Sequence, residues 1–532
     1  MIEFGDDLHD APVNGIALTR KLFQLPKQHL QTLEAAQIHL NARRSDRNHN
    51  RIMTAPTDKS WPTDSLPVNG TGVDPLLESR SDAGRATALN ATKSVARGSV
   101  RGKDVAMTSL AASWDTIDRY VVISTDTHAG ADLLDYKPYL TSQLHDDFDA
   151  WANTYVSPFD DLVIATAQRN WDHALRMSEM DADGVAAEVL LPNTVPPFFP
   201  TTPNITITLP RTRDEFEKRW AGVQAHNRWQ IDFCSLAPAR RRGLIQVFPN
   251  DVDLALDEIR WGAEQECFGG VLLPAVSPGD PNVAPLFHTR YEPLWALCTA
   301  LDLTVVQHAG AGSPVMPMDQ PASNAVLVTE MAMWAQRTVS HLILAGVFER
   351  HPALRFVPTE QGTLWLQQQM MLLDVMVPSM KSEAGNRTYG MFGGSSIDEL
   401  KLAPSEYAKR NCYLASEITP YESSMIDYMG ADHLMWGSDY PHEEGFAPHS
   451  KLAIRWALHD QPEAVCRKIL AGNAGRLYRF DLEALAPVGA KIGPTVDEVH
   501  TPLGDTGYVA PPAFGYRPFE GGLALKRLAP AR

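Results

Sequence analysis

Cysteine is scarce in this sequence, and its spacing excludes whole classes of protein. Only five cysteines occur in 532 residues, and no two of them form a Cys-x-x-Cys pair. A disulfide-rich secreted scaffold and a thiolate metal site both need closely spaced cysteines, so neither is expected. We therefore predict reduced thiols and a cytoplasmic protein. The cysteines are Cys234, Cys267, Cys298, Cys412 and Cys466.

The sequence also lacks long apolar runs and an excess of positive charge. No apolar run reaches the roughly 18 residues that a membrane-spanning helix needs. The beginning, "MIEFGDDLHDAP", is acidic and has no apolar centre, which argues against a signal peptide. Lys and Arg number 47 against 64 Asp and Glu, giving a net charge of -17. Nucleic acids and anionic membranes attract basic faces, so we expect neither as a partner and predict a small-molecule substrate instead.

Composition divides the chain into three parts. Residues 1–115 are polar and Ser/Thr-rich with no sustained periodicity, which predicts a largely disordered extension, and Met107 is a candidate for the true start. Residues 116–481 carry regular apolar patterns and form the expected main domain. Residues 482–532 are rich in Pro and Gly, as in "VAPPAFGYRPFEGG", and we expect an extended arm that packs on the main domain or on a neighbour.

The middle part alternates short apolar runs with amphipathic segments. Such runs are too short for helices and are typical of parallel strands buried on both faces. Eight of them separated by helices predict an α/β fold, a (β/α)8 TIM barrel with long lid loops. A doubly wound sheet is the alternative, but no Gly-rich phosphate turn follows the first run. The predicted strands are 120–125, 185–191, 243–248, 269–275, 303–310, 354–362, 412–416 and 433–439.

Polar side chains follow several of these predicted strands. In a TIM barrel the carboxyl ends of all strands open on one face, where catalytic groups gather. Asp126 and His128 end the first strand, His308 the fifth, Glu360 the sixth and Asp439 the eighth. One histidine at a strand end is weak support for a metal site, but this set would converge over the barrel axis. Other strand ends carry Asn193, Asn250, Ser416 and Glu417.

Six motifs in this region resemble one family. They are "TDTHAG", "DADGVAAEVLLPN", "YEPLWALCTALDLTVVQHAG", "HLILAGVFERHPALRFVPTEQG", "MWGSDYPHEEG" and "ILAGNAGRLY". Between about Tyr120 and Phe480 the chain resembles the amidohydrolase superfamily, in the amidohydrolase-related group that includes aminocarboxymuconate-semialdehyde decarboxylase-like enzymes. "GSDYPH" is the most specific motif, and its aspartate occupies the position of the metal ligand on strand eight of that family.

The resemblance implies a metal site built from four residues. It makes His128 the first metal histidine, Asp126 the acid two residues before it, His308 the ligand on strand five, and Asp439 a ligand and proton carrier. The family's strand-six histidine is replaced by Glu360. The second strand-one histidine is absent and "GGVLLPA" on strand four offers no bridging acid or lysine. We therefore expect one divalent ion, Zn²⁺ or Mn²⁺, which both accept imidazole and carboxylate ligands.

Two reactions stay open at such a site. In a decarboxylase the metal would hold a substrate carboxylate while Asp439 protonates carbon, and the single-metal site slightly favours this reading for a small aromatic or unsaturated acid. In a hydrolase of an amide, ester or lactone, Asp439 would take a proton from metal-activated water. A non-catalytic scaffold is a remote third reading. Glu360 is an additional acid/base, a group that orients the metal-bound species, or an ion-pair partner for Arg169 or another buried cation.

Four further residues are candidates for contacts with substrate. Arg169 and Trp171 could grip a carboxylate and stack on a ring, although a helix cap and a core tryptophan are the plainer readings. Asn193 lies at a strand end, and His442 follows Asp439 closely enough to line the same pocket. The family tendency also implies a homodimer.

Overall fold

The computed structural model describes residues 113–156, 167–193, 196–200, 208–389, 396–442 and 444–503. All of them belong to one compact unit, Val105–Arg532. The predicted disordered extension therefore lies outside the described residues, apart from 113–115. None of the described helices is long and apolar enough to cross a membrane.

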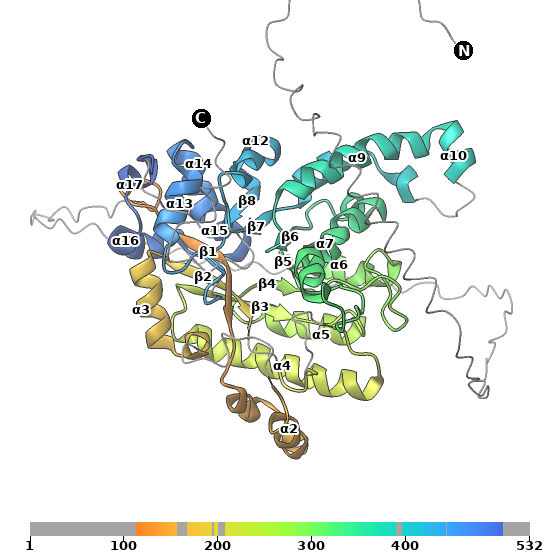
Figure 1. The fold of residues 1–532 in the computed structure, drawn as a ribbon, viewed down its shortest axis with the longest axis horizontal. Coiled ribbons are helices and arrows are strands. Elements are labelled where there is room, and N and C mark those ends of the chain that lie inside the picture. The colour runs from red at the N-terminus through yellow and green to blue at the C-terminus, as the bar shows by residue number, and fades with distance from the viewer. Residues whose placement is uncertain are drawn as a thin grey trace, which may run out of the picture. The chain divides into compact units, whose positions relative to one another are not determined.

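Eight parallel strands form the centre of the structure, each paired with the next along the chain (Figure 1). This order confirms the predicted (β/α)8 barrel and excludes the doubly wound sheet, in which the strand order would reverse. The strands are β1 Ile123–Ala129, β2 Ala187–Pro192, β3 Arg241–Gln246, β4 Phe268–Leu272, β5 Thr304–His308, β6 Phe356–Thr359, β7 Leu414–Ser416 and β8 Leu434–Trp436.

The barrel closes between β1 and the segment that follows β8. The backbone N–H of Asp439 donates to the carbonyl of Asp126 at 2.9 Å, and the N–H of His128 donates to the carbonyl of Tyr440 at 2.6 Å. These bonds hold the end of the first strand directly beside the segment after the last one. Closure thus brings together two regions that lie more than 300 residues apart in sequence, and both carry predicted ligands.

Helices surround the strands and cover them with one apolar face each. In α5, for example, Ala255, Leu256 and Ile259 are buried, and Asp251 caps the helix by accepting from the N–H of Leu254 at 3.2 Å. The helices are α2 His145–Ala152, α3 His173–Asp183, α4 Arg213–Ser235, α5 Val252–Ala263, α6 Glu292–Ala300, α7 Ser323–Leu344, α8 Val347–Arg350, α9 Leu364–Lys381, α10 Glu383–Tyr389, α11 Pro404–Asn411, α12 Met425–Met429, α13 Ser450–Leu458, α14 Glu463–Arg467, α15 Asn473–Tyr478, α16 Leu482–Ile492 and α17 Val496–His500.

Apolar side chains fill the interior of the barrel, and polar side chains lie next to them at the carboxyl ends of the strands. Val306 on β5 and Met435 on β8 belong to one buried cluster with residues from the other strands. Side chains two residues apart in a strand share a face. His308 therefore lies above Val306 on the same face, and Asp439 follows three residues after the end of β8. The apolar layer forms a floor, and the predicted ligands stand on it.

The chain after Leu482 differs from the extended arm that its Pro and Gly content predicts. Helix α16 contains Pro487, yet Asp481 caps its first turn and Leu485 and Ile492 are buried. Helix α17 follows, and both lie beside helices of the barrel (Figure 1). The apolar spacing and the cap outweigh the proline, so the prediction was wrong for residues 482–500. Residues 504–532 lie outside the described part of the chain.

Candidate metal centre

Strand β1 supplies two site residues from one face. Asp126 and His128 are two residues apart and both side chains are buried. The pairing of β1 with β2 shifts register between Ser124 and Thr127, at the position of Asp126. Register irregularities of this kind often lie next to active sites because they redirect a side chain.

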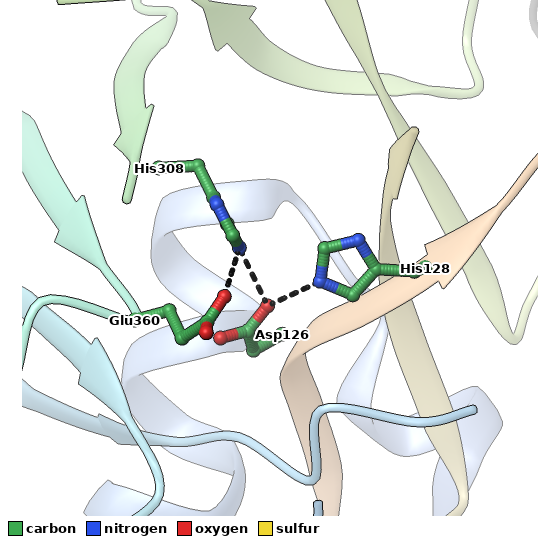
Figure 2. A group of neighbouring side chains, drawn as sticks. All are labelled: Asp126, His128, His308 and Glu360. Atoms are coloured by element: carbon green, nitrogen blue, oxygen red, sulfur yellow. Dashed lines mark ion pairs between the residues drawn. The ribbon is translucent and has the colours of Figure 1, made fainter. Parts of the chain in front are cut away.

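Two histidines converge on one oxygen of Asp126. The Nε2 atom of His128 lies 3.4 Å from Oδ1 of Asp126, and the Nε2 atom of His308 lies 3.6 Å from the same oxygen. Glu360 Oε2 lies 2.7 Å from His308 Nε2. Figure 2 shows the two imidazoles approaching the carboxylates from β1 and β5. The ligand atoms of these four residues all lie within 4.8 Å of one another.

The outer nitrogen of each imidazole fixes its tautomer. His128 Nδ1 lies 3.2 Å from the carbonyl of Pro192, and His308 Nδ1 lies 2.8 Å from the carbonyl of Ala309. A carbonyl oxygen can only accept, so Nδ1 carries the proton in both rings. In the neutral form, Nε2 then presents its lone pair to the centre, as metal-binding histidines do.

The inner atoms of this group are buried without hydrogen-bond partners among the described residues. They are both oxygens of Asp126 and the Nε2 atoms of His128 and His308. Buried polar atoms that lack partners cost about 1–3 kcal/mol each, and more when charged. One divalent cation bound by these atoms would remove that cost. Two imidazoles and carboxylate oxygens suit Zn²⁺ or Mn²⁺, so the residues fit such an ion.

Asp439 also approaches Nε2 of His128 and has a second histidine partner. Its Oδ1 is 3.2 Å from His128 Nε2 and 2.7 Å from His442 Nδ1. His442 Nε2 lies 3.2 Å from the side-chain oxygen of Asn193, whose amide donates to Asn170 at 2.6 Å. The structure thus brings the predicted residue His442 into contact with both Asp439 and the predicted residue Asn193.

The backbone is left-handed at two of these acids. The φ angle is 53° at Glu360 and 56° at Asp439. Residues other than glycine rarely adopt this conformation, and it costs on the order of 1 kcal/mol or more. At both positions it turns the chain sharply just after β6 and β8. The conformation therefore directs two carboxylates toward the barrel axis.

Glu417 is a residue whose role the sequence reasoning missed. It follows β7 and was placed at a strand end, but no function was assigned to it. Both of its oxygens are buried without hydrogen-bond partners among the described residues. A ligand atom of Glu417 lies within 4.8 Å of one on Asp126 and one on Asp439. Its position directly after a buried strand was the available signal, since β7 ends at Ser416, and Ala415, two residues before Glu417, belongs to the buried apolar cluster.

The ionisable side chains of this group shift one another's pKa values. Burial alone would raise the pKa of Asp126, but the neighbouring imidazoles of His128 and His308 hold it below its ordinary value. Burial would lower the pKa of both histidines, yet the surrounding carboxylates raise it. Burial raises the pKa of Glu417 well above its ordinary value, and Asp439 adds to the shift. These surroundings therefore favour the ionised form of the two aspartates and the protonated form of Glu417.

Arg169 and Trp171 do not join this group. Arg169 Nε donates to Glu179 at 2.9 Å, so the predicted alternative that pairs Arg169 with Glu360 is wrong. Glu360 pairs with His308 instead, which makes it a candidate ligand. Trp171 packs against an apolar cluster that includes Ala129.

Comparison with known families decides the relationship. A family model described as "Amidohydrolase" matches residues 171–480, more than half of the chain. The chain belongs to the amidohydrolase family. The matched region begins after β1, so it does not include Asp126 and His128. The structure places β1 in the barrel of this amidohydrolase, because β1 pairs with the segment after β8.

Solved structures share the fold of this amidohydrolase. A 5-carboxyvanillate decarboxylase from Novosphingobium aromaticivorans, in a mutant form with bound manganese and 3-methoxy-4-hydroxy-5-nitrobenzoic acid, has a TM-score of 0.52 and 19% identity over 68% of this chain and 98% of its own. A 5-carboxyvanillate decarboxylase from Sphingomonas paucimobilis is 21% identical over 68% of this chain and 99% of its own, with a TM-score of 0.48. No curated protein matches the sequence.

Proposed function

We propose that this amidohydrolase is a mononuclear metal-dependent decarboxylase, a carboxy-lyase acting on a small aromatic or unsaturated carboxylic acid. One observation carries the proposal: the Nε2 atoms of His128 and His308 face one oxygen of Asp126, and none of the three has a hydrogen-bond partner among the described residues. Strand β4, "FGGVL", offers no acid or lysine that could bridge a second ion. The donor set therefore suits one metal.

The proposed ligands are Asp126, His128, His308 and Asp439, with Glu360 as a further ligand or as an acid/base. Zn²⁺ and Mn²⁺ both suit this set. A bound ion would supply a Lewis acid that holds and polarises an acidic substrate. The decarboxylase of the same fold that contains manganese and a nitrobenzoic acid supports this choice of metal and of substrate class.

Asp439 is the proposed proton donor. In decarboxylation the bond between the carboxyl group and its neighbouring carbon breaks, CO2 leaves, and the electron pair stays on that carbon. A proton must then be added to the carbon. Asp439 can take this proton from His442, whose Nδ1 lies 2.7 Å from the Asp439 carboxylate, and pass it to the carbon. Microenvironments that pair an acid with a histidine are suited to such transfer.

The proposed substrate contacts are His442, Asn193, Arg169 and Trp171. His442 and Asn193 form one polar wall beside Asp439. Asn170 accepts from Asn193 at 2.6 Å, which connects this wall with the segment that carries Arg169 and Trp171. The ion pair between Arg169 and Glu179 is about one-third exposed, so a substrate carboxylate can compete for the guanidinium.

Hydrolysis of an amide, ester or lactone is the second candidate. The family is described by that chemistry, and Asp439 with His442 could equally accept a proton from water. The two reactions differ in products, which makes them separable: only decarboxylation releases CO2 from a substrate that lacks an amide or ester bond.

The test is a paired screen of protein loaded with Zn²⁺ or Mn²⁺. We expect CO2 release from hydroxybenzoate-type acids and no turnover of amides, esters or lactones. D439N should lower turnover by at least a thousandfold while the barrel stays folded. D432N is the matched control, because Asp432 lies just before β8 in an exposed ion pair with Lys468, and it should keep full activity. Hydrolysis alone would favour the second candidate, and an active D439N would show that the site is misassigned.

A homodimer is the proposed assembly, formed through α9. The exposed apolar side chains of this helix are spaced by about one or two helical turns, so they lie on one face. Exposed apolar faces of this kind commonly mark protein contacts. Analytical ultracentrifugation should give a dimer for the wild type and a monomer for M371E/V375E. V156E, at an exposed valine elsewhere, should remain dimeric. A monomeric wild type would contradict the assembly. The residues are Leu364, Met371, Leu372 and Val375.

The proposed location is the cytoplasm. All five cysteines lie in the described part of the chain and all are free thiols. Free, mostly buried thiols are typical of proteins that work in a reducing compartment. Cell fractionation followed by immunodetection should recover the protein with cytoplasmic markers, and recovery with secreted proteins would contradict this location.

A further inference from the structure

A second cavity lies outside the metal centre, between the loop after β4 and helix α7. Its volume is about 250 Å³, and none of its lining residues belongs to the metal centre. A cavity of roughly 150 Å³ already accommodates a benzene ring. The loop side contributes apolar side chains that include Val283, Leu286 and Phe287, and α7 contributes one face of its C-terminal half.

Two polar atoms of residues that line this cavity lack partners among the described residues. Arg337 Nη1 and Trp334 Nε1 are both buried, and neither has a hydrogen-bond partner among the described residues. The guanidinium carbon of Arg337 lies 5.8 Å from the centre of the Trp334 ring, so the two donors come from neighbouring groups. A buried donor without an acceptor is costly, and an arginine is the most costly case. Both atoms therefore require an acceptor that the described residues do not supply.

The other ionisable groups of the cavity leave Arg337 as its cation. Burial and the nearby Arg337 lower the pKa of His341 to about 4, so that imidazole is neutral, and it packs edge-on against Phe287 at 5.2 Å. Asp280 also lines the cavity, but its Oδ1 accepts from the backbone N–H groups of Asn282 and Val283 at 2.8 and 3.1 Å. Its charge is thus engaged within its own loop.

We propose that this cavity is a second ligand site, which takes a small aromatic carboxylate. The carboxylate would accept from Arg337 and from Trp334 Nε1, and the ring would lie against the apolar wall of the loop. A guanidinium with a neighbouring N–H donor matches the two oxygens of a carboxylate. Inorganic phosphate or sulfate has no apolar part to bury here, so it fits the cavity less well. The proposal does not depend on which reaction the metal centre performs.

Hydrogen bonds connect the elements around this cavity with the metal centre, although the two sites share no residue. Gln336, adjacent to Arg337, donates to the carbonyl of Gln361 at 2.8 Å, and Gln361 directly follows Glu360. Gln361 in turn donates to the carbonyl of Gln307, next to His308, at 2.7 Å. On the loop side, Ser277 donates to the carbonyl of Ser313 at 2.8 Å. An occupant would therefore contact α7, which is hydrogen-bonded to the segment that carries Glu360, and this segment is in turn hydrogen-bonded to the end of β5.

Two measurements on the metal-loaded full-length protein test the site. Crystals soaked with 4-bromobenzoate should show an anomalous bromine peak in this cavity, separate from any peak at the metal centre. In calorimetric titrations with 4-fluorobenzoate, the wild type should take up one more equivalent than R337Q. R260Q changes an exposed arginine on α5 and should behave as the wild type. Inorganic phosphate should bind at least tenfold more weakly than 4-fluorobenzoate.

A structural role for Arg337 predicts a different pattern. Because its Nη1 has no partner, R337Q should melt at the wild-type temperature or above. W334F removes only the indole donor and should weaken uptake at this site about three- to tenfold. Bromine found only at the metal centre, or equal stoichiometry in wild type and R337Q, would overturn the proposal. A peak in the crystal without the additional equivalent in solution would mean binding at crystal concentration only, and would also overturn it.

Discussion

At the scale of single residues, the candidate metal centre is a group of buried polar atoms that lack hydrogen-bond partners among the described residues. His128 and His308 each use Nδ1 on a backbone carbonyl, which leaves Nε2 for the interior. Asp126 lies between them with both oxygens unsatisfied. Fixed tautomers and a buried carboxylate form a preorganised metal site, because little rearrangement is needed on binding.

Metal affinity should therefore rise with pH. The carboxylates raise the pKa of His128 and His308, so the metal-free protein keeps protons on both rings up to a higher pH than usual. The metal must displace those protons, and affinity should rise up to about tenfold per pH unit for each ring still protonated. Competition with a chelator at pH 6, 7 and 8 measures this. An affinity that is the same at pH 6 and pH 8 would contradict it.

Most of these residues could be predicted from the sequence, but the directions of their side chains could not. The order of Asp126, His128, His308 and Asp439 at strand ends follows from strand periodicity and barrel topology, so it could be predicted. The approach of Glu360 to His308 depends on a left-handed φ angle, which no pattern of apolar residues encodes. That is why Glu360 was read as an acid/base or as a partner for Arg169.

At the scale of elements, a buried charge network holds β1, β2, β3 and α3 in place. Glu188 on β2 pairs with Arg176 on α3 at 2.7 Å and with Arg241 on β3 at 2.9 Å. Arg176 also donates to the backbone carbonyl of His128 at 2.8 Å. Burial alone would raise the pKa of Glu188, but the two arginines lower it to about 2. The network thus positions a candidate ligand through its backbone.

Breaking this network should destabilise the protein strongly. E188Q leaves two buried arginines without their counterion, and we expect the free energy of unfolding to fall by about 3–5 kcal/mol near neutral pH. The contribution of Glu188 is complete above its unfolded pKa and is lost as pH falls toward 2, so the difference should shrink in acid. Urea denaturation measures it.

The control for that change is an exposed pair. Arg213 and Glu217 lie one turn apart on α4, with both side chains mostly exposed. R213Q should lower stability by less than about 1 kcal/mol. If E188Q and R213Q had equal effects, the buried network would not have the role assigned to it.

The elements themselves were predictable, whereas their ends were not. Seven of the eight strands appear within the predicted apolar runs or within two residues of them, whereas β1 ends four residues beyond its predicted run. The predicted sixth and eighth strands are longer than β6 and β8. The apolar residues and candidate ligands continue in the sequence beyond the last hydrogen bonds between the strands. Helix α16 was missed because its proline suggested loop, although Asp481 and three buried side chains favour a helix.

At the scale of the whole molecule, the barrel is a unit whose described part begins at residue 113. Ser113 donates to Glu483 on α16 at 2.6 Å, and Ile117 and Tyr120 are buried. The first described residues therefore pack against helices from the other end of the unit. This supports the proposed boundary between the extension and the barrel near residue 115.

A chain that starts at Met107 should therefore fold and bind metal as the full chain does. It keeps every residue that contacts the barrel in the described structure. A chain that starts at Val121 is the matched control: it lacks Ile117 and Tyr120 and should melt at least several degrees lower. Thermal melting and metal content measure both. Loss of folding in the chain from Met107 would show that residues 1–106 belong to the barrel's core.

The metal-to-protein ratio of the purified protein tests the central claim most directly. Elemental analysis by mass spectrometry should find one divalent ion, zinc or manganese, per chain. The variant H128A/H308A, which removes both imidazoles facing Asp126, should bring the ratio close to zero while the barrel stays folded. A wild-type protein that holds no stoichiometric metal, or that holds two ions per chain, would contradict a single-metal centre.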